Sequence, residues 1–190
     1  MKRALVLLAD GFEEVEAITS IDFLRRADID VVAVGVTGRD VEGGHEIRVL
    51  SDVTIDELDT GDDGGCLDEY DALIVPGGAA GAKNIAADER AMKLVRGALR
   101  DGKLVAAICA APGLVLGAND LLGAHRFTCY PGFESHATSG SFVEDRVVVD
   151  GNLITSRGPG TAAEFAEAIV NRLVGSDAAS ELHGRTLQKS

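Results

Sequence analysis

The sequence is poor in cysteine, with three among 190 residues, and the three follow no CxxC spacing. An odd number of unclustered cysteines argues against a disulfide framework and against a zinc ribbon. A buried cysteine usually behaves as a small apolar residue, which is the interpretation we favour for Cys66 and Cys129. Cys109 differs from them because it directly follows an apolar run.

Long apolar runs are also absent, since no stretch approaches the roughly 18 residues that cross a membrane. The apolar segment at residues 4–9 is too short for a signal sequence, and Asp10 ends it. We therefore expect no membrane partner and a cytoplasmic location. Because there is no linker, repeat or break in composition, we expect residues 1–190 to form a single domain.

Basic charge is scarce. Five lysines and thirteen arginines stand against 31 acidic residues, eighteen of them aspartates, which gives a net charge of −13. This balance argues against nucleic acid as a partner. A surface rich in Asp and poor in Lys also suggests adaptation to high salt, where ions screen self-repulsion. The alternative is an ordinary acidic protein.

Common metal and nucleotide motifs are missing. The histidines His45, His125, His136 and His183 form no HxxxH or HExxH pair, so we expect no metal site. Surface or structural roles are the better interpretation for them, and whether one assists at Cys109 stays open. No P-loop occurs, and no GxGxxG opens the first predicted helix.

Strand and helix signals alternate along the chain. Apolar runs typical of buried parallel strands occur at residues 3–9, 29–36, 72–75 and 104–108. Helices are predicted at 13–27, 88–100 and 161–174, the last opened by a Thr161/Glu164 capping box. A hairpin is predicted at 146–155, a short strand at 46–50 and a surface loop at 62–65. The alternation predicts an α/β fold with a mostly parallel central sheet covered on both faces.

The setting of Cys109 predicts a reactive thiol. The apolar run before it and the small residues Ala110-Ala111-Pro112-Gly113 after it are typical of a strand, a tight turn and a helix. This is a nucleophile elbow with sulfur in place of oxygen. A thiol there faces solvent and the positive end of a helix, and both effects favour the thiolate.

Two further turns are expected beside Cys109, because the carboxyl ends of parallel strands meet at one edge of a sheet. One begins a helix with Glu13, Glu14 and Glu16. Acidic residues there are stabilised by the helix dipole, but one of the three could instead lean toward the sulfur. Burial and like charge would then raise its pKa and keep it protonated.

The other turn, Pro76-Gly77-Gly78, could let backbone amides approach a reacting oxygen. The amides of Gly78 and Ala110 are the natural oxyanion donors. The segment 156–161 either binds an anion at a helix start or is a glycine-rich turn with an N-cap.

Five segments in order resemble the DJ-1/PfpI (ThiJ/PfpI) superfamily, and specifically its DJ-1-like branch. They are KRALV at residues 2–6, GFEEVE at 11–16, VPGG at 75–78 with Gly81-Ala82, AAICAAP at 106–112 and TSRGPGT at 155–161. The resemblance implies a flavodoxin-like three-layer sandwich, a homodimer and no cofactor.

Site residues follow from the same resemblance. It implies that Cys109 is the nucleophilic, oxidation-sensitive cysteine, that Glu16 is its protonated partner, and that Gly78 and Ala110 donate their amides. Arg26 and Pro159 match positions that the family uses near the pocket at its dimer interface.

Two departures from the family pattern bear on activity. Peptidase-like relatives place a histidine directly after the cysteine, where this chain has Ala110, so a PfpI-type peptidase is disfavoured. Some DJ-1-like members carry a histidine where this chain has Tyr130, whose phenol is a poor base at neutral pH. The obvious general base is therefore missing.

The residues and the resemblance favour two functions and argue against a third. The first is a cofactor-free glyoxalase or deglycase that acts on small aldehydes such as methylglyoxal or on glycated substrates. The second is a redox sensor or redox-regulated chaperone in oxidative stress, through oxidation of Cys109 to the sulfinic acid. The third, a glutamine amidotransferase-like enzyme, requires a GxCxG elbow, which Ile108-Cys109-Ala110 does not provide.

Overall fold

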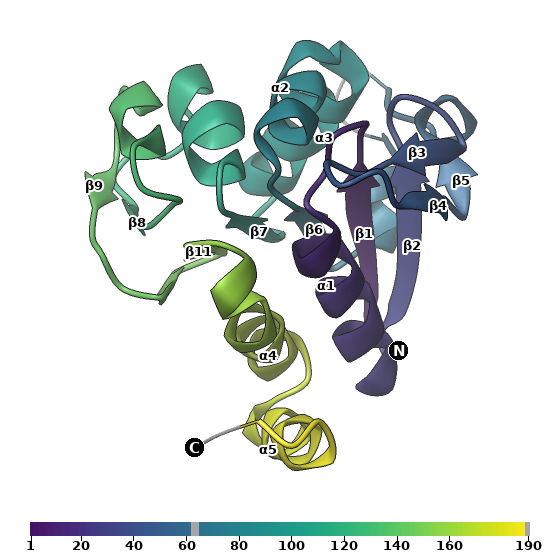
Figure 1. Cartoon of the computed structure of the whole chain (residues 1–190), viewed down its shortest axis with the longest axis vertical. Coiled ribbons are helices and arrows are strands. Elements are labelled where there is room, and N and C mark those ends of the chain that lie inside the picture. Colours follow the sequence, from purple (N-terminus) through teal and green to yellow (C-terminus); the bar gives the residue numbers. More distant parts are fainter. Residues whose placement is uncertain (62–64, 189–190) are drawn as a thin grey trace.

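Seven strands form the central sheet of the computed structural model, which describes residues 1–61 and 65–188. They are β1 (Arg3–Leu8), β2 (Asp30–Gly35), β5 (Val53–Thr54), β6 (Ala72–Val75), β7 (Leu104–Ile108), β10 (Val147–Asp150) and β11 (Leu153–Ser156). Their order across the sheet is β10-β11-β7-β6-β1-β2-β5 (Figure 1). Every neighbouring pair is parallel except β10 and β11, which form the predicted hairpin.

Helices cover this sheet in two groups (Figure 1). The first contains α1 (Glu14–Arg26), α4 (Ala162–Leu173) and α5 (Ser176–Arg185), and the second α2 (Ala79–Ala87) and α3 (Glu89–Arg100). In the first group α1 packs on α4 and α4 on α5, while α3 packs on β6 and β7. The flavodoxin-like α/β sandwich is confirmed.

The sheet is buried because its central strands carry almost no polar side chains. Ala4–Leu8, Ala72–Val75 and Leu104–Ile108 are buried throughout, as expected for parallel strands covered on both faces. Asp88 caps α3 as predicted, since its carboxylate accepts hydrogen bonds from the amides of Arg90 and Ala91.

Two small strand pairs lie outside the sheet. An antiparallel hairpin is formed by β3 (Asp40–Glu42) and β4 (Arg48–Leu50), and β8 (Arg126–Phe127) pairs with β9 (Ser141–Phe142). The strand expected at 46–50 begins only at Arg48, because Glu46 has a left-handed φ of 65° in the turn. The surface loop expected at 62–65 lies outside the described residues apart from Gly65, which begins a 3-10 turn.

The prediction of a capping box at Thr161 is wrong. The Thr161 hydroxyl bonds to Gly158 and to Ser156, and the Glu164 carboxylate pairs with Arg146. Neither side chain is therefore available to the first turn of α4. Thr161 instead closes the loop that precedes the helix.

The helix expected after Cys109 is short and irregular. Pro112–Leu116 is wound as a π-helix, and Gly117–Asn119 follows as a 3-10 turn. Pro112 has no backbone N–H, and at Gly113 a Cβ would lie 2.3 Å from the Phe133 carbonyl oxygen. No helix in the described ranges is both long and apolar enough to cross a membrane.

Candidate active site around Cys109

Cys109 lies at the end of β7 in the sharp turn that the sequence predicts. Its φ is 64°, in the left-handed region that residues with a Cβ seldom adopt. The Cys109 amide donates to Ser156 O at 2.9 Å, and its carbonyl accepts from the Tyr130 amide at 2.8 Å. Backbone bonds on both sides therefore hold the strained residue in place.

The Cys109 sulfur is enclosed rather than aimed at solvent, since the residue is only 9% exposed. Backbone amides of Gly78 and Ala110 donate hydrogen bonds toward the sulfur. Gly78 precedes α2 with a φ of 81°, and a Cβ on it would lie 2.2 Å from Gly11 O. The turns after β1, β6 and β7 thus meet around one thiol.

Glu16 is the acid that points into this space. It is fully buried in the first turn of α1, and its Oε2 accepts a 2.8 Å hydrogen bond from the Gly77 amide. Its Oε1 has no hydrogen-bond partner among the described residues. The carboxyl is close enough to the Cys109 thiol that each group shifts the pKa of the other.

Gly77 makes the approach of acid and thiol possible. A Cβ on Gly77 would lie 2.5 Å from the Cβ of Cys109 and 2.6 Å from Oε2 of Glu16. The sequence interpretation assigned a role to Gly78 and missed Gly77. The signal that could have found it is that Pro76, at the end of a buried strand, is followed by two glycines rather than one.

Burial dominates the ionisation of both groups. It raises the pKa of Glu16 from 4.5 to about 7, against the opposing hydrogen bond from Gly77. Burial, followed by the Glu16 charge, raises the pKa of Cys109 to about 12, although the two amides oppose this. The low thiol pKa expected from the sequence is therefore wrong. Near neutral pH the Cys109–Glu16 pair retains at least one proton and carries at most one negative charge.

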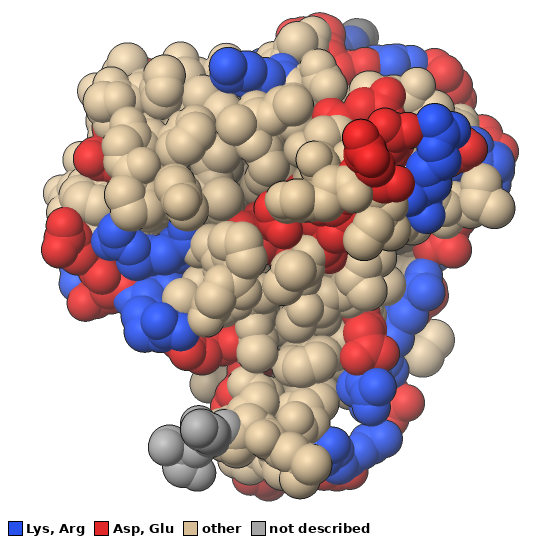
Figure 2. Space-filling model, in the orientation of Figure 1, with Lys and Arg blue, Asp and Glu red and all other residues tan. Residues whose placement is uncertain are grey.

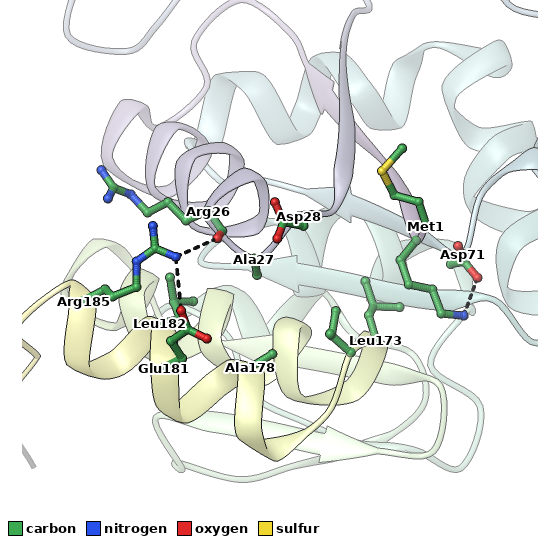
Figure 3. A pocket seen from close by; sticks show the side chains of 12 residues that line it. Met1, Arg26, Ala27, Asp28, Asp71, Leu173, Ala178, Glu181, Leu182 and Arg185 are labelled. Carbon is green, nitrogen blue, oxygen red and sulfur yellow. Dashed lines mark hydrogen bonds and ion pairs between the residues drawn. The ribbon is translucent and has the colours of Figure 1, made fainter.

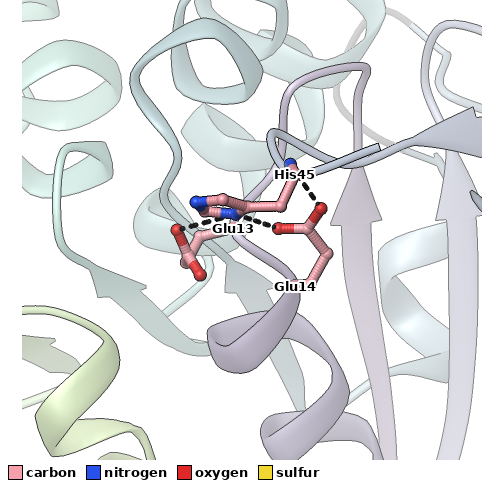
Figure 4. A group of neighbouring side chains, drawn as sticks. All are labelled: Glu13, Glu14 and His45. Carbon is pink, nitrogen blue, oxygen red and sulfur yellow. Dashed lines mark hydrogen bonds and ion pairs between the residues drawn. The ribbon is translucent and has the colours of Figure 1, made fainter. Parts of the chain in front are cut away.

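The other two glutamates at the start of α1 face elsewhere (Figure 4). Glu14 is buried against the β3–β4 turn, where Oε1 accepts from the His45 amide at 2.6 Å and Oε2 lies 2.8 Å from His45 Nδ1. Glu13 Oε2 lies 3.9 Å from the same Nδ1, and the charge of Glu13 contributes to the raised pKa of Glu16.

The donor atoms of Glu13, Glu14 and His45 lie within 4.8 Å of one another, close enough to share a metal ion. The positive end of the α1 dipole lies at the same place and opposes a cation. We interpret the cluster as a clamp between α1 and the hairpin turn. The absence of a metal site stays a prediction.

Tyr130 and Pro159 line a shallow groove next to the thiol. The groove has a volume of about 250 Å³, and its other walls include Arg157 and Gly158. Tyr130 is 47% exposed, and its ring lies against Gly158. The position at Gly158 also faces Oε1 of Glu16, so the groove adjoins the buried pair.

Arg26 does not lie at this site. It is ten residues beyond Glu16 on α1, which corresponds to about 15 Å along the helix. Its guanidinium pairs with Asp22 at 2.6 Å. The residue also lines a separate cavity of about 570 Å³ together with Asp28 and Arg185 (Figure 3). The described contacts do not bring Arg26 to Cys109 within this chain, and its part in a pocket at a dimer interface stays a prediction.

The other histidines make their contacts elsewhere. His125 pairs with Asp150 at 3.4 Å, and His183 pairs with Glu167 at 3.1 Å. His136 is exposed, and its ring packs against Phe133. No described contact joins any of the four histidines to Cys109, so the structure offers no imidazole base there.

Fold and site together define an α/β protein of flavodoxin-like fold with a cysteine at a nucleophile elbow. The chain belongs to the DJ-1/PfpI family, whose sequence profile matches residues 2–172. It is 39% identical to the DJ-1 homolog B of Arabidopsis thaliana over 96% of its length, but it spans only 40% of that protein.

Two further relatives match over most of both chains. A protein of Pyrococcus abyssi that is named a deglycase is 34% identical, over 90% of this chain and 99% of its own. The crystal structure of Drosophila melanogaster DJ-1beta superposes with a TM-score of 0.91 at 37% identity, covering 100% of this chain and 99% of that chain.

Proposed function

We propose that the protein is a cofactor-free enzyme that converts 2-oxoaldehydes such as methylglyoxal, or their adducts on glycated substrates, into 2-hydroxy acids. The observation that supports this is the buried Glu16 carboxyl, which Gly77 holds beside the Cys109 thiol. A nucleophile next to an acid that titrates near pH 7 suits a reaction with two proton transfers.

The chemistry needs only these groups and water. The Glu16 carboxylate accepts the thiol proton of Cys109 and passes it to the aldehyde oxygen as Sγ bonds to the aldehyde carbon, which forms a hemithioacetal. The Glu16 carboxylate then removes the proton from that carbon and returns it to the neighbouring carbon, while the hydroxyl proton moves to the neighbouring oxygen, leaving a thioester of the 2-hydroxy acid. Water cleaves the thioester, releasing lactate and the thiol. The amides of Gly78 and Ala110 would stabilise the oxyanions.

Two observations support aldehyde chemistry over peptide hydrolysis. Peptide cleavage requires a base that also protonates the leaving amine, and no described contact brings a histidine to Cys109. In addition, the Pyrococcus abyssi relative is named a deglycase. In this chain Ala110 follows the cysteine, so the imidazole of peptidase-like relatives is missing.

Lactate production from methylglyoxal tests the proposal. The wild-type protein should produce lactate, whereas Cys109→Ser and Glu16→Gln should each lose at least about a hundredfold in turnover. Cys66→Ser is the matched control, because Cys66 is a free cysteine on the turn at Gly65–Glu69, which contributes no residue to the site. This variant should retain full activity. A Cys109→Ser protein as fast as the wild type would overturn the proposal.

Oxidation sensing is a second candidate, because the same groups can hold an oxidised sulfur. Two peroxide molecules would convert the thiol to a sulfinic acid with release of two waters, and Glu16 would donate a hydrogen bond to the new oxygens. Mass spectrometry after mild peroxide distinguishes the sites. A gain of two oxygens on Cys109 supports sensing, and equal oxidation of Cys66 and Cys109 contradicts it.

A homodimer is the assembly that we propose. Apolar side chains stand exposed on α1 and on the β3–β4 hairpin: Val15, Ile18, Ile47 and Leu50 are 42–73% exposed. Such a group suits contact with a second copy of the chain. Sedimentation should give twice the mass of 19.8 kDa, and Ile18→Asp should produce monomers.

A further inference from the structure

Arg157 is unusual among the arginines of this acidic chain. Of the thirteen, only Arg157 and Arg172 make no side-chain hydrogen bond or ion pair within residues 1–61 and 65–188. Arg172 is exposed on α4, where water satisfies its donors. Arg157 is half-buried in the groove beside Tyr130, so its five N–H donors are left for another acceptor.

The other basic residue of this groove is already engaged. Arg146 binds the Glu164 carboxylate at 2.7 Å and the Gly160 carbonyl at 2.8 Å. The helix that follows the groove, α4, directs its positive end toward it. Basic and acidic side chains lie together near the start of α4, whereas the side chains over the start of α1 are acidic (Figure 2). Arg157 is therefore the basic residue of the groove that no ion pair within the described residues neutralises.

The groove also borders the reactive pair. At Gly158 a Cβ would lie 3.2 Å from the Tyr130 ring and 4.0 Å from Oε1 of Glu16. That oxygen is buried and has no partner in the described part of the chain. A group bound in the groove would thus lie beside the carboxyl that faces the thiol.

We propose that the groove binds an oxyanion, either a phosphate or a carboxylate. This group would belong to the aldehyde substrate, at a distance from the carbon that reacts with Cys109. Arg157 is its ligand, since a planar guanidinium matches two oxygens of either group. The binding stands on the groove itself, and only its role as part of a substrate rests on the proposed function.

Charge explains why such a subsite would decide specificity. The protein carries −13, and Glu13, Glu14 and Glu16 begin the helix at the reactive site. An anionic substrate would be repelled there unless a fixed cation held its charged end. Methylglyoxal is neutral and does not require Arg157, whereas a phosphorylated or carboxylated adduct does.

Binding can be measured without turnover by NMR of the Cys109→Ser protein labelled with ¹³C-tyrosine. The chain has two tyrosines, and Tyr70 is a built-in reference because it is buried beneath Arg3. Inorganic phosphate, propionate and neutral acetamide are titrated at constant ionic strength. The Tyr130 signal should shift saturably with phosphate or propionate, showing which oxyanion is preferred, and should not shift with acetamide.

Variants then identify the ligand. Arg157→Met should weaken this binding at least about tenfold, and Arg172→Met, which removes the other unpaired arginine, should leave it unchanged. An unchanged Tyr130 signal in the parent, or equal binding by Arg157→Met, would overturn the proposal. The Tyr70 signal reports whether each variant is folded.

A kinetic comparison tests the link to catalysis. The methylglyoxal adducts of guanosine and of guanosine monophosphate differ only by the phosphate. We expect kcat/KM to favour the phosphorylated adduct about tenfold, and Arg157→Met to abolish that ratio. A ratio that Arg157→Met leaves intact contradicts the subsite. If the wild-type protein shows no turnover of methylglyoxal, the proposed function is contradicted instead. The binding measured by NMR is then unaffected.

Discussion

The Gly77 amide donates a 2.8 Å hydrogen bond to Oε2 of Glu16, joining the turn after β6 to the first turn of α1. This bond fixes one carboxyl oxygen, while the other, Oε1, has no hydrogen-bond partner in the described residues. The acid is therefore oriented before any substrate arrives, and the glycine leaves the space in which Cys109 meets it.

Gly77→Ala should damage both stability and activity. The new methyl group would lie 2.5 Å from Cβ of Cys109 and 2.6 Å from Oε2 of Glu16, so one of them must move. We expect a loss of roughly 1–3 kcal/mol in the free energy of unfolding, measured by urea denaturation, and loss of lactate production.

Gly184→Ala is the matched control for that substitution. Gly184 lies within α5, and a Cβ there meets nothing within 4 Å. This variant should be as stable as the parent or up to about 1 kcal/mol more stable. If Gly77→Ala proves as stable and as active as Gly184→Ala, Cys109 and Glu16 do not lie as close to Gly77 as the structure indicates.

The raised pKa of Glu16 predicts a specific pH dependence of stability. In the unfolded chain the carboxyl loses its proton near pH 4.5, and in the folded protein near pH 7. Between these values the native state binds more protons, so the free energy of unfolding falls as the pH rises. The total loss is about 3 kcal/mol by pH 8.

Glu16→Gln should remove this loss. Relative to the wild type, the variant should gain about 3 kcal/mol between pH 4.5 and pH 8, measured by urea denaturation at each pH. Glu144→Gln, at an exposed position, should follow the wild-type curve. Parallel curves for the wild type and Glu16→Gln would show that Glu16 titrates normally.

Much of this fold could be predicted from the sequence because its strands are short uninterrupted apolar runs. The strands before Pro76 and Cys109 were located to the residue, and the turn at Cys109 followed from the small residues after it. These features depend on neighbours along the chain. The Thr161 capping box failed because contacts with Ser156 and Arg146 outweigh the local pattern.

The site was less predictable because its chemistry depends on burial and on contacts between distant segments. Glu13, Glu14 and Glu16 occupy one helical turn, and the residues alone do not show which of them faces the thiol. The choice depends on contacts with other turns. The Gly77 amide donates to the Glu16 carboxyl, and the His45 ring lies against the Glu14 carboxylate. The low pKa expected for Cys109 was wrong for the same reason, since a position in the sequence does not reveal enclosure.

Thr161→Val should loosen the loop that borders the groove. The buried hydroxyl lies 2.6 Å from Ser156 Oγ, accepts from the Gly158 amide at 3.1 Å and donates to the Gly158 carbonyl at 2.9 Å. Valine has the same shape but leaves these groups unsatisfied, at a cost of about 1–3 kcal/mol. Thermal unfolding measures the loss. Thr186→Val, near the exposed end of α5, should change stability by less than about 0.5 kcal/mol.

Salt should stabilise the protein, because the two electrostatic effects act over different distances. Raising NaCl from about 0.1 M to about 1 M shortens the screening length from about 10 Å to about 3 Å. Repulsion among charges that sum to −13 acts mostly beyond 10 Å and is removed. Surface pairs such as Arg39–Glu57, at 2.6 Å, contribute at most about 1 kcal/mol each and are screened less at contact.

The midpoint of thermal unfolding should therefore rise steadily with NaCl. Glucose at matched osmolality is the control for effects of water activity, and it should give a smaller rise. Substituting three exposed aspartates, Asp40, Asp145 and Asp177, by asparagine should reduce the dependence on salt, because less repulsion remains to be screened. A midpoint that falls with NaCl would mean that the ion pairs outweigh the repulsion, and the hypothesis of salt adaptation would be wrong.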